Sequence, residues 1–308
     1  MGYAYDGGYN SLQQFFNTFN TWRTTRIIDR YIANKLVRRY DELKNEDSYV
    51  VKKSKSIMDL VLRQKLDNPR VIAGDREFME MAVSNVKSFL VAGHETTAYL
   101  GYAYMLLSKN PQALEKARQE HDQVFDPDLN RTVEILRANP GRLYDLHYTT
   151  GIIKEALRLF PAASSTRTCA KGYRFMYKGR DLQLTDQIVI ICSLAMHYNP
   201  NLFPSPCEFQ PERYTTQAVP KDAWRPFERG SRSCIGQNLA MMEMRMVLLL
   251  VLRSFDFEAL GIKPHNNPIA TYTNLDTIYG DLIYQRQALT ARPIGGQSMK
   301  VKFAEREY

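Results

Sequence analysis

Residues 226–240 read PFERGSRSCIGQNLA, and this stretch decides how the rest of the chain is interpreted. Five of its positions form the pattern F-x-x-G-x-R-x-C-x-G: Phe227, Gly230, Arg232, Cys234 and Gly236. An apolar run follows, so the loop ends where a helix begins, and backbone N–H groups and the positive end of the helix dipole face the sulfur. Such a site favours a thiolate, the form of cysteine that binds a metal. The glycines let the backbone approach a flat cofactor closely. The alternative is an inert, buried cysteine in a glycine turn.

Length, composition and charge leave several classes of partner open. The chain has 308 residues, of which 44% are hydrophobic and 24% charged, which is an ordinary globular mixture for one large domain or two smaller ones. Its formal net charge of +8 suits nucleic acid, an anionic membrane surface or an acidic protein. Because no Lys/Arg-rich block is interleaved with aromatic residues, we do not expect a nucleic-acid partner. A basic surface that is merely solvated remains the alternative.

Cysteine content and hydropathy predict the cellular compartment of the chain. Four cysteines in a chain this long do not form a disulfide framework, and no C-x-x-C pair predicts a zinc site. We therefore expect reduced thiols in a cytosol-facing protein. The apolar run over residues 246–252 is too short to span a bilayer. Residues 1–10 read as neither a signal peptide nor an anchor, so we expect membrane contact only through an anchor that this chain lacks.

The hydrophobic periodicity predicts a mainly α fold with small β-sheets, in a single domain over residues 1–308. We expect an irregular start over 1–20 and a loop over 46–55. Helices are predicted over 25–43, 57–66, 76–108, 111–125, 143–160 and 234–255. Short strands are predicted near 173–177 and 188–192, and a hairpin over 288–303 that turns at 293–296. The long helix, about 75–109 with Asp75 as its cap, far exceeds the usual length and must cross a whole domain.

Poor helix formers cluster in the middle of that long helix, where residues 92–97 read AGHETT. A glycine costs about 1 kcal/mol in a helix interior, and a threonine there can bond back to the carbonyl four residues earlier. Several unfavourable choices in a row predict a site, with Glu95 and Thr96 as its acid and hydroxyl. The alternative is a helix with a polar stripe.

Three further motifs that contain charged residues lie downstream. Glu155 and Arg158 form E-x-x-R, a spacing that allows an ion pair on a helix but is common. Arg213 follows in P-E-R-Y, residues 211–214. Arg167 ends the stretch PAASSTR, where a bidentate carboxylate contact would suit a guanidinium, although a surface arginine is the alternative.

Together these motifs resemble those of the cytochrome P450 family, the haem-thiolate monooxygenases. The loop at 227–236 resembles the haem-ligating signature, and AGHETT is similar to the oxygen-activating motif of the long central helix. E-x-x-R and P-E-R-Y follow the family pattern, with Tyr214 in place of phenylalanine. The four motifs occur in the family's order. The resemblance covers most of the chain from Asp75 onward, and the helices before it more loosely.

The resemblance implies a role for each candidate residue. Cys234 would be the axial ligand of the haem iron. Arg232 and Arg167 would contact the haem propionates, and Phe227 and Gly236 would border the haem. Glu95 and Thr96 would take part in oxygen activation and proton delivery. The structural network would be formed by Glu155, Arg158 and Arg213.

The resemblance also implies an activity: insertion of one oxygen atom of O2 into an organic, apolar or polyketide- or terpenoid-like substrate. Electrons would come from NADPH through a separate reductase, docked on arginines near the cysteine loop. Residues 221–227, KDAWRPF, are similar to fungal secondary-metabolism members. Intact eukaryotic relatives are expected on the cytosolic face of the endoplasmic reticulum membrane, and we expect the N-terminal part of the cytochrome P450 fold to be missing here. Two alternatives stay open: a non-catalytic truncated fragment, and a haem-thiolate isomerase or dehydratase, against which Thr96 argues.

Overall fold

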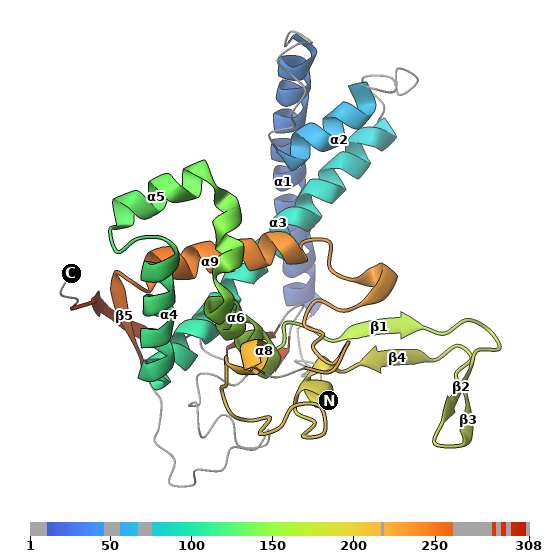
Figure 1. Cartoon of the computed structure of the whole chain (residues 1–308). Helices are drawn as coiled ribbons and strands as arrows, with labels where there is room; N and C mark the ends of the chain where they lie inside the picture. Colours follow the sequence, from blue (N-terminus) through green and yellow to red (C-terminus); the bar gives the residue numbers. More distant parts are fainter. Residues whose placement is uncertain are drawn as a thin grey trace. The chain divides into compact units, whose positions relative to one another are not determined.

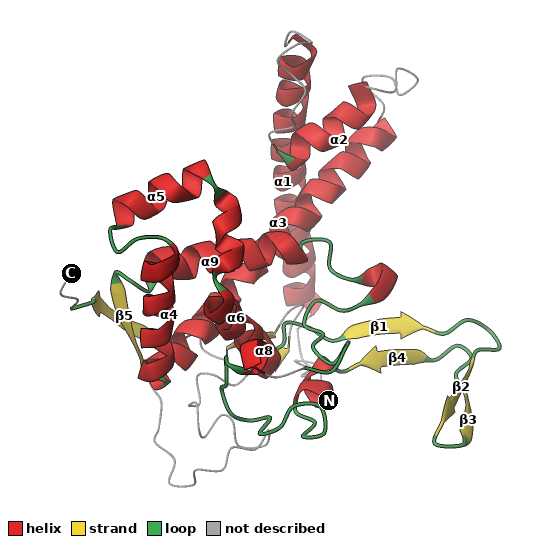
Figure 2. Cartoon of the chain, viewed as in Figure 1, coloured by secondary structure: helices red, strands yellow, loops and turns green. Residues whose placement is uncertain are grey.

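The computed structural model describes residues 11–45, 56–66, 76–216, 219–260, 285–287, 291–293 and 297–305. Helices dominate these residues and the strands are short, as Figure 2 shows, so the predicted fold class is confirmed. The backbone contacts divide the chain into two compact units, residues 1–93 and 94–308. The single domain inferred from the sequence stays a prediction.

The first unit is built from helix α1 (Ser11–Asn45), helix α2 (Ile57–Leu66) and the first half of helix α3 (Arg76–Lys109). Helices α2 and α3 match the prediction. The expected irregular start is wrong for residues 11–20, because this stretch has no Gly or Pro and continues the helix. Phe16 and Phe19 of this stretch are exposed, so its hydrophobic residues do not follow the periodic pattern of a helix with one buried face. The predicted loop at 46–55 and the cap at Asp75 lie outside the described residues.

The core of the first unit is small and lies where its three helices meet. Its buried side chains come from one face of α1, from α2 and from the start of α3: Ile32, Leu36, Leu43, Leu62, Phe78, Ala82 and Val83. Two arginine contacts support this packing, since Arg39 donates hydrogen bonds to both carboxylate oxygens of the buried Asp59 on α2 at 2.7 and 3.2 Å. A buried carboxylate needs such a partner to offset its desolvation.

The second unit carries most of the described helices (Figure 1). They are α4 (Pro111–Val124), α5 (Leu129–Ala138), the 3-10 helix η1 (Pro140–Asp145), α6 (His147–Leu159), α7 (Ser193–His197), α8 (Arg213–Thr216), the 3-10 helix η2 (Gly230–Arg232) and α9 (Gln237–Val251). The single helix predicted over 143–160 is corrected: a 3-10 turn precedes α6, and α6 begins at His147. Helix α5 was not predicted, although the Asp128 carboxylate caps it by accepting from the Asn130 N–H at 2.9 Å.

Each sheet among the described residues is an antiparallel pair. Strand β1 (Ser165–Thr168) pairs with β4 (Ile188–Ile191), and β2 (Arg174–Tyr177) pairs with β3 (Arg180–Gln183). Strand β5 (Phe255–Ala259) pairs with β8 (Met299–Phe303), and β6 (Gln285–Gln287) with β7 (Ala291–Pro293). The predicted hairpin over 288–303 is therefore wrong. Its second strand pairs with β5 after α9, and periodicity alone cannot reveal such a distant partner.

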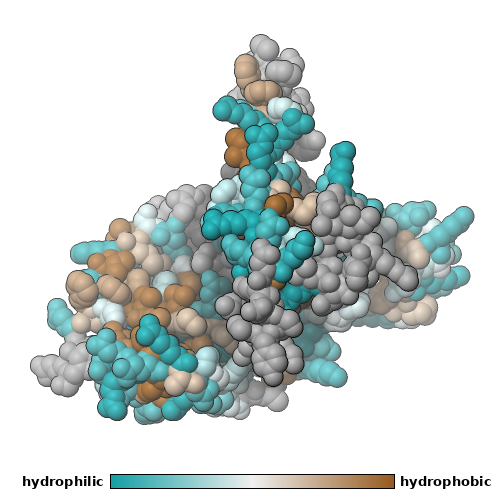
Figure 3. Space-filling model, turned by 90° about the horizontal axis from the view of Figure 1, so that it is seen from above, coloured by the Kyte–Doolittle hydropathy of each residue, from teal (hydrophilic) through white to brown (hydrophobic). Residues whose placement is uncertain are grey.

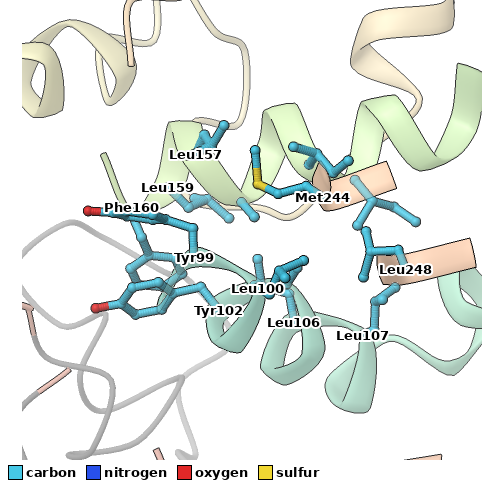
Figure 4. Packing of buried hydrophobic residues seen from close by; sticks show 14 of the residues in the cluster. Tyr99, Leu100, Tyr102, Leu106, Leu107, Leu157, Leu159, Phe160, Met244 and Leu248 are labelled. Carbon is cyan, nitrogen blue, oxygen red and sulfur yellow. The ribbon is translucent and has the colours of Figure 1, made fainter. Parts of the chain in front are cut away.

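The main core of the second unit forms where the end of α3 meets α6 and α9 (Figure 4). Tyr102 of α3 stacks on Phe160 just after α6, with ring centroids 4.4 Å apart. Met244 and Leu248 of α9 are buried against the same cluster. Full burial of such side chains stabilises a fold by about 1.5–3 kcal/mol each. Helix α6 thus shares one core with the end of α3 and with α9, and it carries Glu155 and Arg158.

Large hydrophobic side chains also lie exposed, and Figure 3 shows hydrophobic and hydrophilic side chains mixed on one face. They occur on α1, on strand β2 and at Ile235 and Leu239 beside the cysteine. None of the helices that the structure describes is both long and apolar enough to cross a bilayer.

Candidate functional site

The cysteine loop is a tight turn closed by backbone hydrogen bonds. The Cys234 N–H donates to the Phe227 carbonyl at 2.8 Å, and the Gln237 N–H donates to the Cys234 carbonyl at 3.3 Å. Gly230 has a φ of +81°, a left-handed conformation that favours glycine. Glu228 also has a positive φ, of +59°, so the loop holds a strained backbone at a non-glycine residue.

The Cys234 thiol is exposed and lies just before α9, whose first residue is Gln237. A Cβ added at Gly236 would lie 3.8 Å from the sulfur, so glycine leaves the space beside the thiol open. The neighbouring apolar side chains are uncovered: Ile235 is 89% exposed and Leu239 61%. A thiol ligand among uncovered apolar side chains fits a large, flat, apolar cofactor that binds through its metal.

The two arginines predicted to contact propionates lie close to this loop. Arg232 is exposed within the loop itself. Arg167 of β1 forms an ion pair with Glu228 at 3.5 Å and keeps 39% of its side chain exposed. Arg225 contacts the same Glu228 carboxylate at 3.4 Å. The structure therefore brings Arg167 to the loop, although the two are far apart in sequence, and this placement suits carboxylate recognition.

Glu155, Arg158 and Arg213 form one buried ion-pair network. Arg158 Nη2 lies 2.6 Å from Glu155 Oε1, and Arg213 Nε lies 3.4 Å from the same oxygen. All three side chains are at most 1% exposed. The Arg158 guanidinium also donates to the carbonyls of His197, Pro206 and Glu208. A network this well satisfied fixes α6 against the segment that leads to α8.

A close backbone approach locks the same two segments together at Gly151. A Cβ at this position of α6 would lie 2.5 Å from the Pro211 carbonyl oxygen. No sequence pattern marked this glycine, because its reason is a distant backbone contact.

Replacing Gly151 by alanine is expected to destabilise the chain by about 1–3 kcal/mol, because the added methyl group must displace backbone. A Cβ added at Gly93 in α3 would meet no atom within 4 Å, so the same substitution there is expected to stabilise by up to about 1 kcal/mol. Urea unfolding of both variants measures the difference. Equal effects at the two positions would contradict the close approach.

Aromatic residues before the loop tie it to α6, a role that the sequence analysis did not assign to them. The Trp224 indole N–H donates to the Lys154 carbonyl at 3.0 Å, and its ring meets Phe227 edge-on at 5.9 Å between centroids. Tyr214 lies edge-on to Trp224, and burial strongly raises the pKa of its hydroxyl. Burial, followed by the nearby arginines, lowers the pKa of Lys154, whose ammonium lies over both rings.

His197 is buried, and both of its ring nitrogens have backbone partners. Nδ1 lies 3.0 Å from the Arg158 carbonyl, and Nε2 accepts from the Arg225 N–H at 3.0 Å. Burial first, and then the Arg158 charge, lower the pKa of His197 to about 4. The ring is therefore neutral over the physiological range.

Acid should weaken the fold through this histidine. Its pKa is about 6.5 when unfolded and about 4 when folded, so the unfolded state binds the proton more readily between these values. The contribution of His197 to the free energy of unfolding is complete above pH 6.5 and is lost as pH falls toward 4. Its total is about 3 kcal/mol. Urea unfolding of the wild type and of His197→Gln at pH 7, 6 and 5 isolates this slope. Parallel curves would contradict the assignment.

The predicted oxygen-side pair, Glu95 and Thr96, lies on helix α3, while the two side chains lie outside the described part of the chain. Their roles stay predictions. On the cysteine side, Arg225 is half-buried and Arg245 is buried with its Nε donating to Thr150 at 2.7 Å. Of the four arginines near the cysteine loop that were expected to dock a reductase (Arg225, Arg229, Arg232 and Arg245), Arg229 and Arg232 are exposed.

Comparisons with known proteins show the family of the chain. The family model described as Cytochrome P450 matches residues 11–274. The chain is 34% identical over 277 residues to cytochrome P450 monooxygenase acrF of Aspergillus aculeatus, covering 81% of this chain and 56% of that protein. It is 38% identical over 207 residues to cytochrome P450 monooxygenase PC-23 of Penicillium crustosum, covering 65% of this chain and 98% of that protein. Human cytochrome P450 4V2 is 36% identical over 218 residues, with 67% and 38% covered.

The chain spans about half the length of several curated relatives that it matches, with 56%, 45% and 47% of their lengths aligned. The family match nevertheless extends over most of the chain and includes the cysteine loop, the long helix and the buried ion-pair network. By this match, the chain belongs to the cytochrome P450 family.

Proposed function

We propose that the chain is the haem-binding part of a haem-dependent monooxygenase, in which the Cys234 thiolate would ligate the iron. One observation carries this proposal: the exposed Cys234 thiol lies at the end of a backbone-closed loop, at the start of α9. Iron binds the deprotonated form of cysteine, so an exposed sulfur at a fixed place in the fold suits this role. Haem, when bound, supplies the activation of O2 and the transfer of one oxygen atom to an organic substrate.

The chain's own residues have distinct roles in this proposal. Arg232 and Arg167 hold the propionate carboxylates through their guanidinium groups. Phe227 and Gly236 border the cofactor near the sulfur. Glu95 and Thr96 would hold and move protons during oxygen activation, where a positioned proton donor contributes about 10²–10⁴-fold to rate.

The electron source and the location follow from the family. Two electrons come from NADPH through a separate flavoprotein reductase, and the second oxygen atom leaves as water. The exposed Arg229 carries positive charge on the cysteine side, which suits an acidic reductase surface. We propose an apolar, polyketide- or terpenoid-like substrate. We place the intact protein at the cytosolic face of the endoplasmic reticulum membrane.

Replacing Thr96 by alanine is expected to lower product formation by about 10²–10⁴-fold while NADPH consumption continues, because proton delivery fails. The measurement uses the haem-loaded chain with a reductase, and compares NADPH oxidised with oxygen incorporated from labelled O2. Thr149→Ala, which removes a buried hydroxyl in α6 instead, is the control.

The same assay separates the monooxygenase from the two alternative functions. Product formed without reductase or NADPH identifies an isomerase or dehydratase. A chain that folds but takes up no haem is a non-catalytic fragment, and either result overturns the proposed monooxygenase.

A further inference from the structure

The buried ion pair of Glu155 and Arg158 has no direct hydrogen bond to the cysteine loop. The guanidinium of Arg158 donates hydrogen bonds to the carbonyls of His197, Pro206 and Glu208, all of which lie outside residues 227–236. An effect of this pair on the loop therefore has to pass through a residue that contacts both. Trp224 joins the loop to α6 at the Lys154 carbonyl, while helix α7 contacts both Arg158 and the residues just before the loop.

His197, the last residue of α7, links the two regions through both of its ring nitrogens. A backbone N–H can only donate, so Nε2 must accept from the Arg225 N–H. The neutral ring then carries its proton on Nδ1 and donates it to the Arg158 carbonyl. The contact is reciprocal, because the Arg158 Nη1 donates to the His197 carbonyl at 3.1 Å.

The Arg225 peptide group is held from its other side as well. Ser193, the first residue of α7, donates its hydroxyl to the Arg225 carbonyl at 3.2 Å. The Glu228 N–H donates to the same carbonyl at 3.3 Å, which begins the turn toward Cys234. Two residues after Arg225, the Phe227 carbonyl accepts from the Cys234 N–H at 2.8 Å. The path from the ion pair to the sulfur is thus continuous in hydrogen bonds and short backbone steps.

We propose that His197 is a positioning residue: by holding the Arg225 N–H, it transmits the placement of Glu155 and Arg158 to the cysteine loop. The ring is also packed edge-on to Phe203 at 5.8 Å between centroids, so its orientation is fixed. The low pKa of His197 supports this role, since a neutral ring keeps the Nε2 lone pair available to Arg225. The ring contacts the backbone groups of two charged residues, Arg158 and Arg225.

The test compares hydrogen exchange at the Arg225 and Cys234 amides in the full chain without added haem. His197→Asn places an amide N–H where Nδ1 was and leaves the Arg225 N–H without its acceptor. His197→Gln reaches the position of Nε2 and offers an oxygen that accepts again. His121→Gln is the control, because His121 is equally buried but contacts Thr149 at 2.7 Å instead of the loop.

In His197→Asn, exchange at both amides is expected to rise by about tenfold, the effect of losing one buried hydrogen bond. His197→Gln is expected to restore most of the protection. His121→Gln, measured at a urea concentration that gives the same folded fraction, is expected to leave the loop amides within about twofold of the wild type. Loop exchange that rises equally in the His197 and His121 variants would reduce His197 to a general packing residue and overturn the proposal.

If His197→Asn does not fold, Ser193→Ala tests the same path, since it removes only the contact to the Arg225 carbonyl. In this variant the loop amides are expected to exchange a few times faster than in the wild type, an increase no larger than the loss of one hydrogen bond would cause. Unchanged exchange there would overturn the proposal.

The consequence for haem rests on the proposed function. In the haem-loaded chain, His197→Asn is expected to convert the reduced CO complex from the thiolate-type to the thiol-type Soret band faster than the wild type. Failure of the wild type to bind haem would overturn the proposed function, while the exchange results would still decide the role of His197.

Discussion

Replacing Glu155 by alanine is expected to destabilise the second unit by about 3–5 kcal/mol, the cost of leaving a buried charge without its partner. Arg158 and Arg213 share this one carboxylate, and all three side chains are at most 1% exposed. Removal of Glu155 also leaves the Gln210 N–H without the oxygen that it contacts at 3.2 Å. Since a whole domain is stable by only about 5–15 kcal/mol, the variant should be largely unfolded under mild conditions.

Urea unfolding monitored by tryptophan fluorescence measures this effect, because Trp224 lies in the same region. Glu80→Ala is the matched control: it removes a carboxylate from an ion pair with Arg76 that is exposed to solvent. Exposed pairs contribute little to stability, so its midpoint should remain close to that of the wild type. Similar midpoints for Glu155→Ala and Glu80→Ala would show that the buried network does not hold the fold.

Loss of the Glu155 network should also affect the mobility of the cysteine loop. Arg158 contacts α7 through the His197 carbonyl, and α7 contacts the loop through Arg225. A variant that stays folded but loses Glu155 is therefore expected to show a mobile cysteine loop before it shows a mobile α9. Helix α9 is held separately by Met244 and Leu248 in the main core.

The sequence predicted the parts of the molecule whose residue types are dictated by chemistry or by helical period. A cysteine between glycines at the start of an apolar helix indicates a metal-binding thiolate, and E-x-x-R placed Glu155 and Arg158 on one helix. Helices α2, α3 and α4 followed from apolar spacing and from proline or loop residues at their ends. Such features are local, so they can be read from one short stretch.

The remaining features depend on contacts between distant residues. The role of His197 requires two backbone groups from other segments, and backbone groups leave no trace in the sequence. The same holds for Trp224, which donates to a carbonyl of α6, and for Gly151, which faces a carbonyl from the P-E-R-Y segment. Strand β8 was assigned to the wrong partner because alternation identifies a strand but not its neighbour.

Replacing Cys234 by serine is expected to abolish thiolate ligation of haem iron while leaving the fold intact. The side chain is exposed, so the substitution removes the sulfur and little else. A hydroxyl is a far weaker donor to iron than a thiolate, and the helix start does not ionise a serine at neutral pH. Cys207→Ser is the control: burial raises the pKa of that half-buried thiol, which makes it a poor ligand.

The most direct test is the absorption spectrum of the reduced, CO-bound chain after incubation with haem. We expect a thiolate-type Soret band in the wild type and in Cys207→Ser, and its complete absence in Cys234→Ser at equal protein concentration. A thiolate-type band that persists in Cys234→Ser, or a folded wild-type chain that never shows one, would contradict the assignment of Cys234 as the iron ligand.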